Sequence, residues 1–353
     1  MATRGARGGS IKQGTSIKRK ATSSSNSRKS KSKHTGVTDR TTSKGAVSSS
    51  KTRGEVPPIL KAFVDRTLKR GVKGCREEFQ QTRAYQPANM SISAFMANVP
   101  RNRYKDIKCL DTTRVVLQNY HTDYIHANWV LGGKLKYICT QAPTENTQED
   151  FWQMVWQCEV VNVVMLCDIK EHERVKCSEY FPVAANQTKT FGLYTICNTT
   201  TENKYLAGGC YVAISKLEVT QTGYAPRTVL HWWWSSWPDR GVPPDSKAVM
   251  KLRKKLLDSS ADQPVVVHCS AGIGRTGTLV MVDMLVTQIE TNQPIDIEAN
   301  MKYIRDQRAS SVQTELQYLF AYKCALEYCR LRFGYIGESK LYEKFNKDLG
   351  DMK

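Results

Sequence analysis

The sequence predicts an α/β fold, because apolar strand patterns and helix patterns alternate along it and meet at a glycine-rich loop. Residues 264–267 are a short, β-branched apolar run, which is typical of a buried strand. Three glycines follow within the next ten residues, and residues 278–285 then have the composition of a buried helix. Residues 160–166 are a second apolar run, broken by a single asparagine, that we expect to be another strand.

Residues 1–55 are expected to be a disordered basic tail. The chain has 353 residues and a net charge of +19, and its first 55 residues hold fourteen Lys and Arg against Asp39 and Glu55, a net +12. They contain almost no large apolar side chains and so cannot bury a core. Basic clusters at residues 18–20 and 28–33 suggest an acidic partner: a nucleic acid, an acidic membrane surface or a nuclear import receptor. The alternative is a solvated tail that only aids solubility.

Residues 56–331 are expected to form one folded domain that begins with a short amphipathic helix over residues 59–68. Residues 332–353 are expected to form a polar C-terminal tail. No run of about 18 apolar residues is present, so no transmembrane segment is expected. The Arg-, Gly- and Ser-rich start argues against a secretory signal peptide. Eleven cysteines without a C-x-x-C pair argue against a zinc site or a disulfide framework. They indicate a reducing compartment, the cytoplasm or the nucleus.

The loop after residues 264–267 is suited to hold an anion beside a nucleophile. Backbone N–H groups of a tight loop converge on one point, and the dipole of the following helix adds partial positive charge. Cys269 begins this loop, where its thiol pKa should be lowered, and Arg275 can hold two phosphate oxygens in its guanidinium fork. One alternative is a dinucleotide pattern over residues 272–277, which lacks the acidic residue expected after a second strand. The other is an inert buried cysteine.

Residues 268–277, H-C-S-A-G-I-G-R-T-G, resemble the phosphate-binding loop of the cysteine-dependent protein tyrosine phosphatases. The resemblance implies a twisted mixed β-sheet flanked by helices on both sides, and hydrolysis of phosphotyrosine in proteins through a phosphocysteine intermediate. Cys269 would be the nucleophile, Arg275 the phosphate clamp, Thr276 the group that stabilises the departing thiolate, and His268 a tuning residue. No metal or other cofactor is expected, because the arginine and the loop dipoles supply the electrostatic stabilisation. The remaining loop residues expected to bind the phosphate are Ser270, Ala271, Gly272, Ile273 and Gly274.

Residues 237–243, W-P-D-R-G-V-P, resemble the movable acid loop of the same family. Attack on phosphotyrosine expels a phenolate whose conjugate acid has a pKa near ~10, so a positioned carboxylic acid should donate a proton. Asp239 lies between Pro238 and Gly241, in a loop suited to close over a substrate. The resemblance makes Asp239 the general acid, with Trp237 in a supporting role.

Residues 101–107 resemble the family's phosphotyrosine-recognition loop. The resemblance implies that Tyr104 stacks on the substrate ring and deepens the pocket, so that phosphoserine falls short of Cys269. Asp106 would accept hydrogen bonds from the substrate backbone, and Lys105 would face acidic residues that flank the phosphotyrosine. Without the resemblance, this segment is a charged surface loop with one aromatic side chain.

Two further segments resemble supporting parts of the family's site. In residues 171–182, Glu171 would pair with Arg275 and orient it, and Lys176 would steady the acid loop. His172, Glu173 and Arg174 are expected to be solvated charges. In residues 311–318, Gln313 would orient the water that hydrolyses the phosphocysteine, assisted by Gln317, while Asp239 takes the proton.

The sequence departs from the family pattern at several positions. His126 replaces a usual Asn, Ala142 and Glu173 replace a usual Gly, Phe181 replaces a usual Trp, and Arg240 follows the acid where an aromatic residue or His is common. We expect His126 and Ala142 to affect loop geometry rather than the chemistry, and the effect of Arg240 on closure of the acid loop is left open.

Two other functions are compatible with parts of the sequence. One is a catalytically silent phosphotyrosine-binding module, although the cysteine, the acid and the arginine are all present. The other is an RNA or lipid phosphatase of the same superfamily, suggested by the basic tail. Tyr104 favours phosphotyrosine-containing proteins as substrates.

Overall fold

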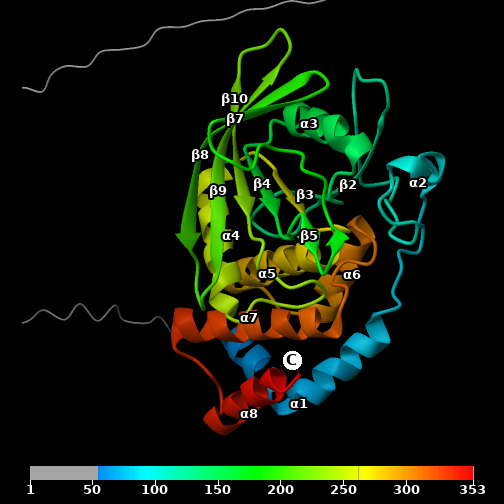
Figure 1. Ribbon diagram of the computed structural model, residues 1–353. Coiled ribbons are helices and arrows are strands. Elements are labelled where there is room, and N and C mark those ends of the chain that lie inside the picture. The colour runs from blue at the N-terminus through cyan, green and yellow to red at the C-terminus, as the bar shows by residue number, and fades with distance from the viewer. Residues whose placement is uncertain (1–54, 261, 353) are drawn as a thin grey trace, which may run out of the picture. The chain divides into compact units, whose positions relative to one another are not determined.

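A nine-stranded mixed sheet organises the computed structural model, which describes residues 55–260 and 262–352 (Figure 1). The strand order is β1-β2-β3-β11-β4-β10-β9-β8-β7, and β5 and β6 form a separate hairpin. The strands are β1 (Arg114–Val116), β2 (Tyr124–Val130), β3 (Tyr137–Thr140), β4 (Asn162–Met165), β5 (Lys170–Glu171), β6 (Arg174–Val175), β7 (Gln187–Phe191), β8 (Tyr194–Tyr205), β9 (Tyr211–Gln221), β10 (Arg227–Trp233) and β11 (Val265–His268).

The central strand β11 runs parallel to both of its neighbours, β3 and β4, with Val267 opposite Cys139 on one side and Val164 on the other. All four residues of β11 are buried. A parallel strand covered on both faces needs apolar side chains at every position, which explains the continuous run predicted as a strand. The carboxyl ends of these three strands meet at one edge of the sheet, and the glycine-rich loop leaves β11 there.

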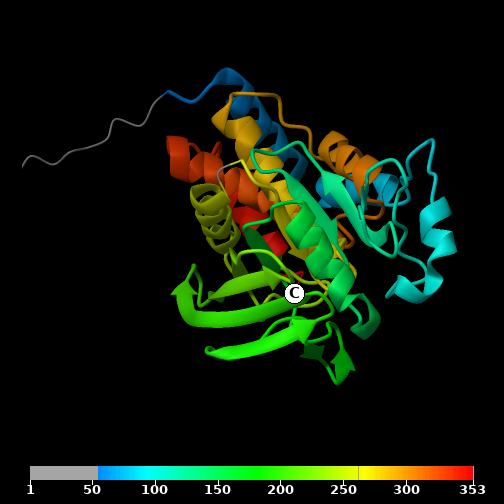
Figure 2. The same ribbon diagram turned by 90° about the horizontal axis from the view of Figure 1, so that it is seen from above.

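Helices cover both faces of the sheet. α4 and α5 pack on β4, β11 and β3, while α3 packs on β2, β7 and β8 (Figure 2). α5 is buried along almost its whole length, which explains why its sequence is apolar all round. The helices are α1 (Pro58–Thr82), α2 (Ser93–Ala97), α3 (Gln148–Gln157), α4 (Ser246–Ser260), α5 (Gly274–Glu290), α6 (Ile297–Gln307), α7 (Glu315–Phe333) and α8 (Ser339–Gly350), with short 3₁₀ turns η1 (Val99–Arg101) and η2 (Glu145–Thr147).

The two ends of the described chain differ from what we expected. Where a C-terminal tail was expected from residue 332, α8 folds back and packs on α1, with Phe345 and Leu349 buried (Figure 1). Leu341 and Tyr342 are partly buried against the same core, so the four side chains form one apolar face at a helical spacing that the sequence-based expectation overlooked. α1 is also longer than the expected lead-in helix, and it contains a kink at Gly71, whose φ of 67° lies in the left-handed region. The expected basic tail lies outside the described residues.

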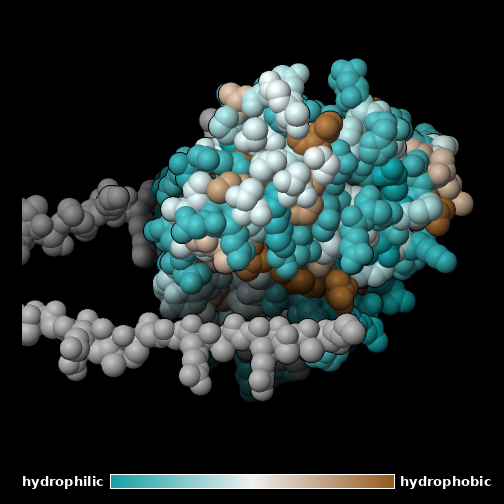
Figure 3. Space-filling view, turned by 45° about the horizontal axis from the view of Figure 1, so that its top comes forward, coloured by the Kyte–Doolittle hydropathy of each residue, from teal (hydrophilic) through white to brown (hydrophobic). Residues whose placement is uncertain are grey.

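The surface is mainly polar. On the face drawn in Figure 3, hydrophobic residues form only small, separate patches. No helix within residues 55–260 and 262–352 combines the length and the apolar character that crossing a bilayer requires. Within the same residues, no three or more Cys, His, Asp or Glu side chains cluster as metal ligands would.

Candidate active site

Cys269 lies in the glycine-rich loop between β11 and α5, and its side chain is almost completely buried. The backbone N–H of Gly272 donates to its Sγ at 3.3 Å. Gly272 has a φ of +70°, and a Cβ at this position would lie 1.9 Å from the carbonyl oxygen of Thr140. Only glycine fits this close approach. The loop therefore points the N–H group of Gly272 at the sulfur.

A buried arginine holds this loop from behind. Arg308 has no exposed surface and donates to the carbonyl oxygens of Ala271 and Gly272, both at 3.1 Å, and to Oδ1 of Asn128 at 2.7 Å. With these carbonyls directed at Arg308, the N–H groups of the loop face the opposite side, where an anion would bind. We did not single out Arg308 in the sequence, because its partners are backbone atoms that no pattern of side chains reveals.

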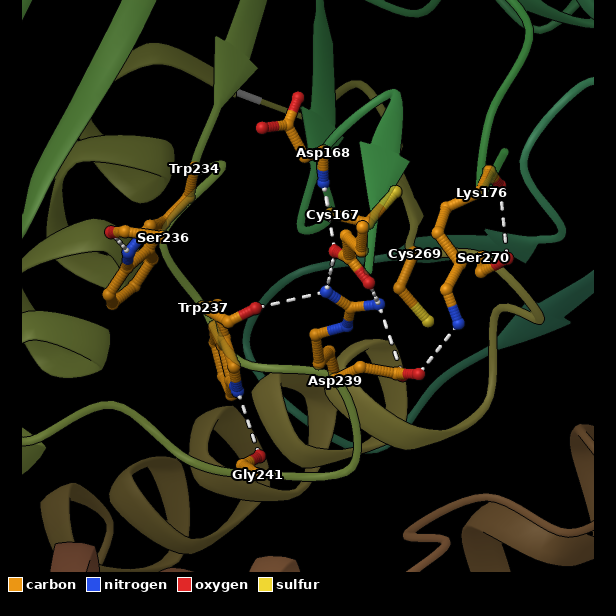
Figure 4. Close-up of polar contacts among 12 residues, drawn as sticks. Cys167, Asp168, Lys176, Trp234, Ser236, Trp237, Asp239, Gly241, Cys269 and Ser270 are labelled. Atoms are coloured by element: carbon orange, nitrogen blue, oxygen red, sulfur yellow. Dashed lines mark hydrogen bonds and ion pairs between the residues drawn. The ribbon is translucent and has the colours of Figure 1, made fainter. Parts of the chain in front are cut away.

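Arg275 is fixed by a bidentate ion pair with Glu171. Its two terminal nitrogens lie 2.6 and 3.1 Å from the carboxylate oxygens of Glu171, and one of them also donates to the carbonyl oxygen of Trp237 at 2.9 Å (Figure 4). Trp237 is itself buried, and its indole N–H donates to the carbonyl oxygen of Gly241 at 3.1 Å. The guanidinium is therefore oriented before any ligand is present.

Asp239 lies beside both Arg275 and Lys176. Its carboxylate is 2.7 Å from Nζ of Lys176 and 3.2 Å from the guanidinium of Arg275. The side chains of Lys176 and Asp239 lie beside Cys269 (Figure 4). Two further hydrogen bonds hold the loop: Thr314 Oγ1 donates to the carbonyl oxygen of Arg240, and Gln317 Nε2 to that of Gly241. The acid loop is thus closed over the site.

The pKa values of Cys269 and Asp239 are both lowered, as the sequence predicted for the Cys269 thiol. Burial alone would raise the pKa of the Cys269 thiol, but the charge of Arg275 and hydrogen bonding from Thr276 and Gly272 lower it below its ordinary value. Burial would likewise raise the pKa of Asp239, and the hydrogen bond from Lys176 together with Arg275 lowers it. The hydroxyl of Thr276 is buried and makes no hydrogen bond among the described residues, so the hydrogen bond from Thr276 to the sulfur is that of its backbone N–H.

A chain of three buried side chains lies behind the nucleophile. His268 Nδ1 is 3.1 Å from the carbonyl oxygen of Cys269, and the hydroxyl of Tyr180 is 2.7 Å from Nε2 of both His268 and His231. Burial lowers the pKa of His268 to about 4, and it lowers the pKa of His231 well below the ordinary value. Both imidazoles are therefore neutral near neutral pH. Neither Tyr180 nor His231 was among the site residues expected from the sequence.

The recognition loop borders a cavity of about 560 Å³ above the sulfur. Tyr104 and Asp106 line it, and the hydroxyl of Tyr104 is 2.7 Å from Oγ of Ser270. Lys105 is exposed and lies outside the cavity lining. Gln313 and Gln317 also line the cavity, and both lie close to Gly274, where a Cβ would be 3.0 Å from Oε1 of Gln313 and 3.2 Å from Nε2 of Gln317. Ile273 is buried and caps the start of α5.

The departures from the family pattern are accommodated locally. His126 is buried and its Nε2 lies 2.9 Å from the carbonyl oxygen of Ile107, so it holds the end of the recognition loop. Ala142 is buried and its N–H donates to the carbonyl oxygen of Ser270. Glu173 has a φ of 62° and forms, with His172, the two-residue turn of the β5–β6 hairpin. Phe181 stacks on His231 with the ring centroids 4.0 Å apart.

Comparison with known proteins identifies the family of this chain. Residues 98–327 match the family model for protein-tyrosine phosphatase. The mouse tyrosine-protein phosphatase non-receptor type 9 is 36% identical over 291 residues, which cover 76% of this chain and 48% of the mouse protein. The Caenorhabditis elegans Lar-like tyrosine-protein phosphatase is 33% identical over 76% of this chain and 12% of its own length. Rat receptor-type tyrosine-protein phosphatase C is 35% identical over 65% of this chain and 18% of its own. The matched region is less than half of the length of each of these relatives. The family model and these identities show that the chain belongs to the protein-tyrosine phosphatase family.

Proposed function

We propose that this chain hydrolyses phosphotyrosine in proteins through a phosphocysteine intermediate. The observation that carries the proposal is the convergence of Cys269, Arg275 and Asp239 on one cavity, with the lowered thiol pKa and Tyr104 at the rim. A thiolate, a fixed guanidinium and a carboxyl group are what phosphoryl transfer to sulfur requires. The catalytically silent alternative has no support in this geometry, since none of the three groups is missing or turned away.

In the first step, the Cys269 thiolate attacks phosphorus and the bond from phosphorus to the tyrosine oxygen breaks. Arg275 and the loop N–H groups hold the three equatorial oxygens, whose charge they neutralise. Asp239, protonated in the substrate complex, gives its proton to the phenolate, so that tyrosine leaves neutral. Arg275 needs no reorientation for this step, because Glu171 already holds it in place.

In the second step, water attacks the phosphocysteine and the sulfur–phosphorus bond breaks. Gln313 and Gln317 lie against Gly274 beside the sulfur, and we assign them the placement of this water. Asp239, now ionised, takes a proton from the water. Inorganic phosphate and the thiolate are the products, and Thr276 supplies a hydroxyl to the returning negative charge on sulfur.

The cavity also suggests why the substrate would be phosphotyrosine. Tyr104 lines its wall, so that an aromatic ring could stack there while its phosphate reaches Cys269. Asp106 lies at the same rim with its carboxylate exposed, where it could accept hydrogen bonds from the backbone of the substrate.

The proposed function can be tested with three substrates in the presence of a chelator: a phosphotyrosine peptide, a 5′-triphosphate RNA and a phosphoinositide. We expect turnover of the peptide by the wild-type protein, far slower turnover of the other two, and none by Cys269→Ser. An inert wild-type protein that still binds the peptide would instead support a phosphotyrosine-binding module. Preferred turnover of RNA or lipid would support the second alternative.

We also propose a domain organisation and a role for the N-terminal segment. Residues 56–331 would form the catalytic domain, α8 would complete its fold, and residues 1–55 would bind an acidic partner through their net charge of +12. The protein would act in the cytoplasm or the nucleus. Deletion of residues 1–54 should change localisation and binding to acidic partners while peptide hydrolysis stays the same; unchanged localisation and binding would exclude a targeting role.

A further inference from the structure

Two arginines at the mouth of the cavity have no carboxylate partner among the described residues. Arg174 lies on β6, Arg240 follows Asp239, and both line the 560 Å³ cavity without taking part in an ion pair. We propose that they form a subsite for an anionic side chain close to the phosphotyrosine of the substrate. This inference rests on the proposed function. It gives Arg174, which we expected from the sequence to be a solvated charge, a role in substrate binding.

The two arginines belong to neighbouring segments, strand β6 and the acid loop. Lys176 follows β6 directly, and its Nζ is 2.7 Å from the carboxylate of Asp239, the residue before Arg240. Side chains of an extended segment alternate between its two sides, so Arg174 and Lys176 lie on the same side of the hairpin. The ion pair of Lys176 with Asp239 therefore brings Arg174 and Arg240 to the same part of the rim.

The carboxylates of the β5–β6 hairpin and of the acid loop are already paired with other cations. Glu171 is paired with Arg275, and Glu173 with Lys170 at 2.5 Å. The carboxylate of Asp239 is shared between Lys176 and Arg275. The positive charge of the two arginines is consequently not balanced within the described part of the protein. A guanidinium prefers a carboxylate or a phosphate, which it can bind with two parallel hydrogen bonds.

Arg240 also has a costly backbone conformation. Its φ of 57° is in the left-handed region, which side chains other than Gly, Asn and Asp rarely adopt. Its carbonyl oxygen accepts the hydrogen bond from Thr314 that holds the acid loop closed. A glycine here would relieve the backbone at no loss of that carbonyl. The conformation thus places a large cationic side chain at the rim whenever the acid loop is closed.

The rim also carries a charge of the other sign. Asp106 lines the same cavity, and its exposed carboxylate makes no ion pair among the described residues. An anionic group of the substrate would be repelled there and attracted to the side of Arg174 and Arg240. The subsite therefore gives direction to the substrate: its anionic side chain lies toward the acid loop. That group is a carboxylate of Asp or Glu, or a second phosphoryl group.

The test uses a series of phosphotyrosine peptides in which one residue near the phosphotyrosine is Glu, phosphoserine, Gln or Lys. The position of this residue is varied along the peptide. The readout is the ratio of kcat/KM for the anionic peptide to that for the Gln peptide, which removes any general change in catalysis. Arg174→Gln and Arg240→Gln should each lower this ratio by about two- to fivefold, as expected for one exposed ion pair, and the double variant by more. The conservative variants Arg174→Lys and Arg240→Lys should restore part of the ratio. A larger ratio for phosphoserine than for Glu would identify a second phosphoryl group as the natural ligand.

The matched control is Lys216→Gln, which removes one exposed cation from β9, outside the cavity lining, and should leave the ratio unchanged. Equal turnover of all peptides by the wild-type protein would overturn the subsite and leave the proposed function intact. A ratio that falls in Lys105→Gln but not in the arginine variants would move the anion preference to the recognition loop and also overturn it. Lack of turnover of every peptide would contradict the proposed function, and the subsite with it.

Discussion

The hydroxyl of Tyr180 lies 2.7 Å from Nε2 of His268, and this contact determines where the protons of the buried chain are. The carbonyl oxygen of Cys269 can only accept, so Nδ1 of His268 carries the proton and its Nε2 is an acceptor. Tyr180 must then donate to His268 and accept from Nε2 of His231. This leaves Nδ1 of His231 without a proton, in agreement with its lack of any hydrogen-bond partner among the described residues.

The two imidazoles should therefore be opposite neutral tautomers, His268 protonated on Nδ1 and His231 on Nε2. Because burial lowers both pKa values, neither should gain a proton from neutral pH down to about pH 5. Long-range proton–nitrogen NMR spectra of ¹⁵N-histidine-labelled protein would report the tautomers directly. The same tautomer at both residues, or a charged imidazole near neutral pH, would contradict the assignment.

Removal of the Tyr180 hydroxyl should change the pKa of the Cys269 thiol, although the two groups make no direct hydrogen bond. In Tyr180→Phe, two buried nitrogens lose their partner, which costs on the order of 1–3 kcal/mol of stability, and the His268 tautomer is no longer fixed. We expect the pKa of the Cys269 thiol to rise, measured as slower alkylation near neutral pH. Tyr137→Phe is the matched control, because that buried hydroxyl makes no hydrogen bond among the described residues. If both variants alkylate at the wild-type rate, the chain has no influence on the thiol.

Lys176 should set the upper pH limit of catalysis. Burial raises the pKa of Asp239, but the hydrogen bond from Lys176 contributes most to lowering it below the ordinary value. The proposed general acid works only while protonated, so activity falls as pH rises through this pKa. Lys176→Met should raise the pKa and move the alkaline limb of the kcat/KM profile to higher pH. Lys170→Met, on the adjacent strand, should not move it; a limb that stays in place in Lys176→Met would contradict the assignment of that limb to Asp239.

The ion pair of Glu171 with Arg275 should matter for the rate. Glu171→Gln keeps an acceptor for Arg275 but loses the charge and the bidentate geometry, so we expect kcat/KM to fall by roughly 10- to 100-fold. Glu173→Gln, two residues along in the hairpin turn, removes an exposed carboxylate and should change little. Steady-state kinetics with one phosphotyrosine peptide compare the two. Equal effects of the two substitutions would mean that Arg275 does not depend on Glu171.

The last helix should contribute to stability rather than to catalysis. Phe345 is almost completely buried against α1, so Phe345→Ala should lower the free energy of unfolding by about 3–5 kcal/mol. Denaturant unfolding measures this loss, and kcat of the folded protein should stay close to the wild-type value. Lys347→Ala on the same helix, whose side chain is not buried, should cost far less. An unchanged stability of Phe345→Ala would return this segment to the role of a tail.

The fold class and the short-range parts of the site were predictable because their signals are local. The strand, the loop and the helix around Cys269 are consecutive in the chain, and each has its own pattern of apolar residues and glycines. The acid loop likewise has its acid, its proline and its glycine within five residues.

Of the long-range contacts, the pair of Glu171 with Arg275 was expected from the resemblance, and others were not predicted. Arg308 reaches backbone carbonyls 36 and 37 residues away, and Tyr180 joins two histidines 51 and 88 residues from it. For both Arg308 and Tyr180 the tertiary fold, rather than the local sequence, provides the partner. Arg174 is exposed and makes no ion pair among the described residues, as expected of a solvated charge, and only its place beside the cavity was not predicted.

The most direct test of the account is detection of phosphate on Cys269. Because Gln313 is assigned to the second step, Gln313→Ala should slow hydrolysis more than phosphoryl transfer, and the intermediate should accumulate. After rapid acid quenching with a phosphotyrosine peptide, mass spectrometry of the proteolytic fragment around Cys269 should show the added mass of one phosphoryl group, and none in Cys269→Ser. Turnover with no adduct on Cys269, or with phosphate on another residue such as His268, would contradict the proposed mechanism.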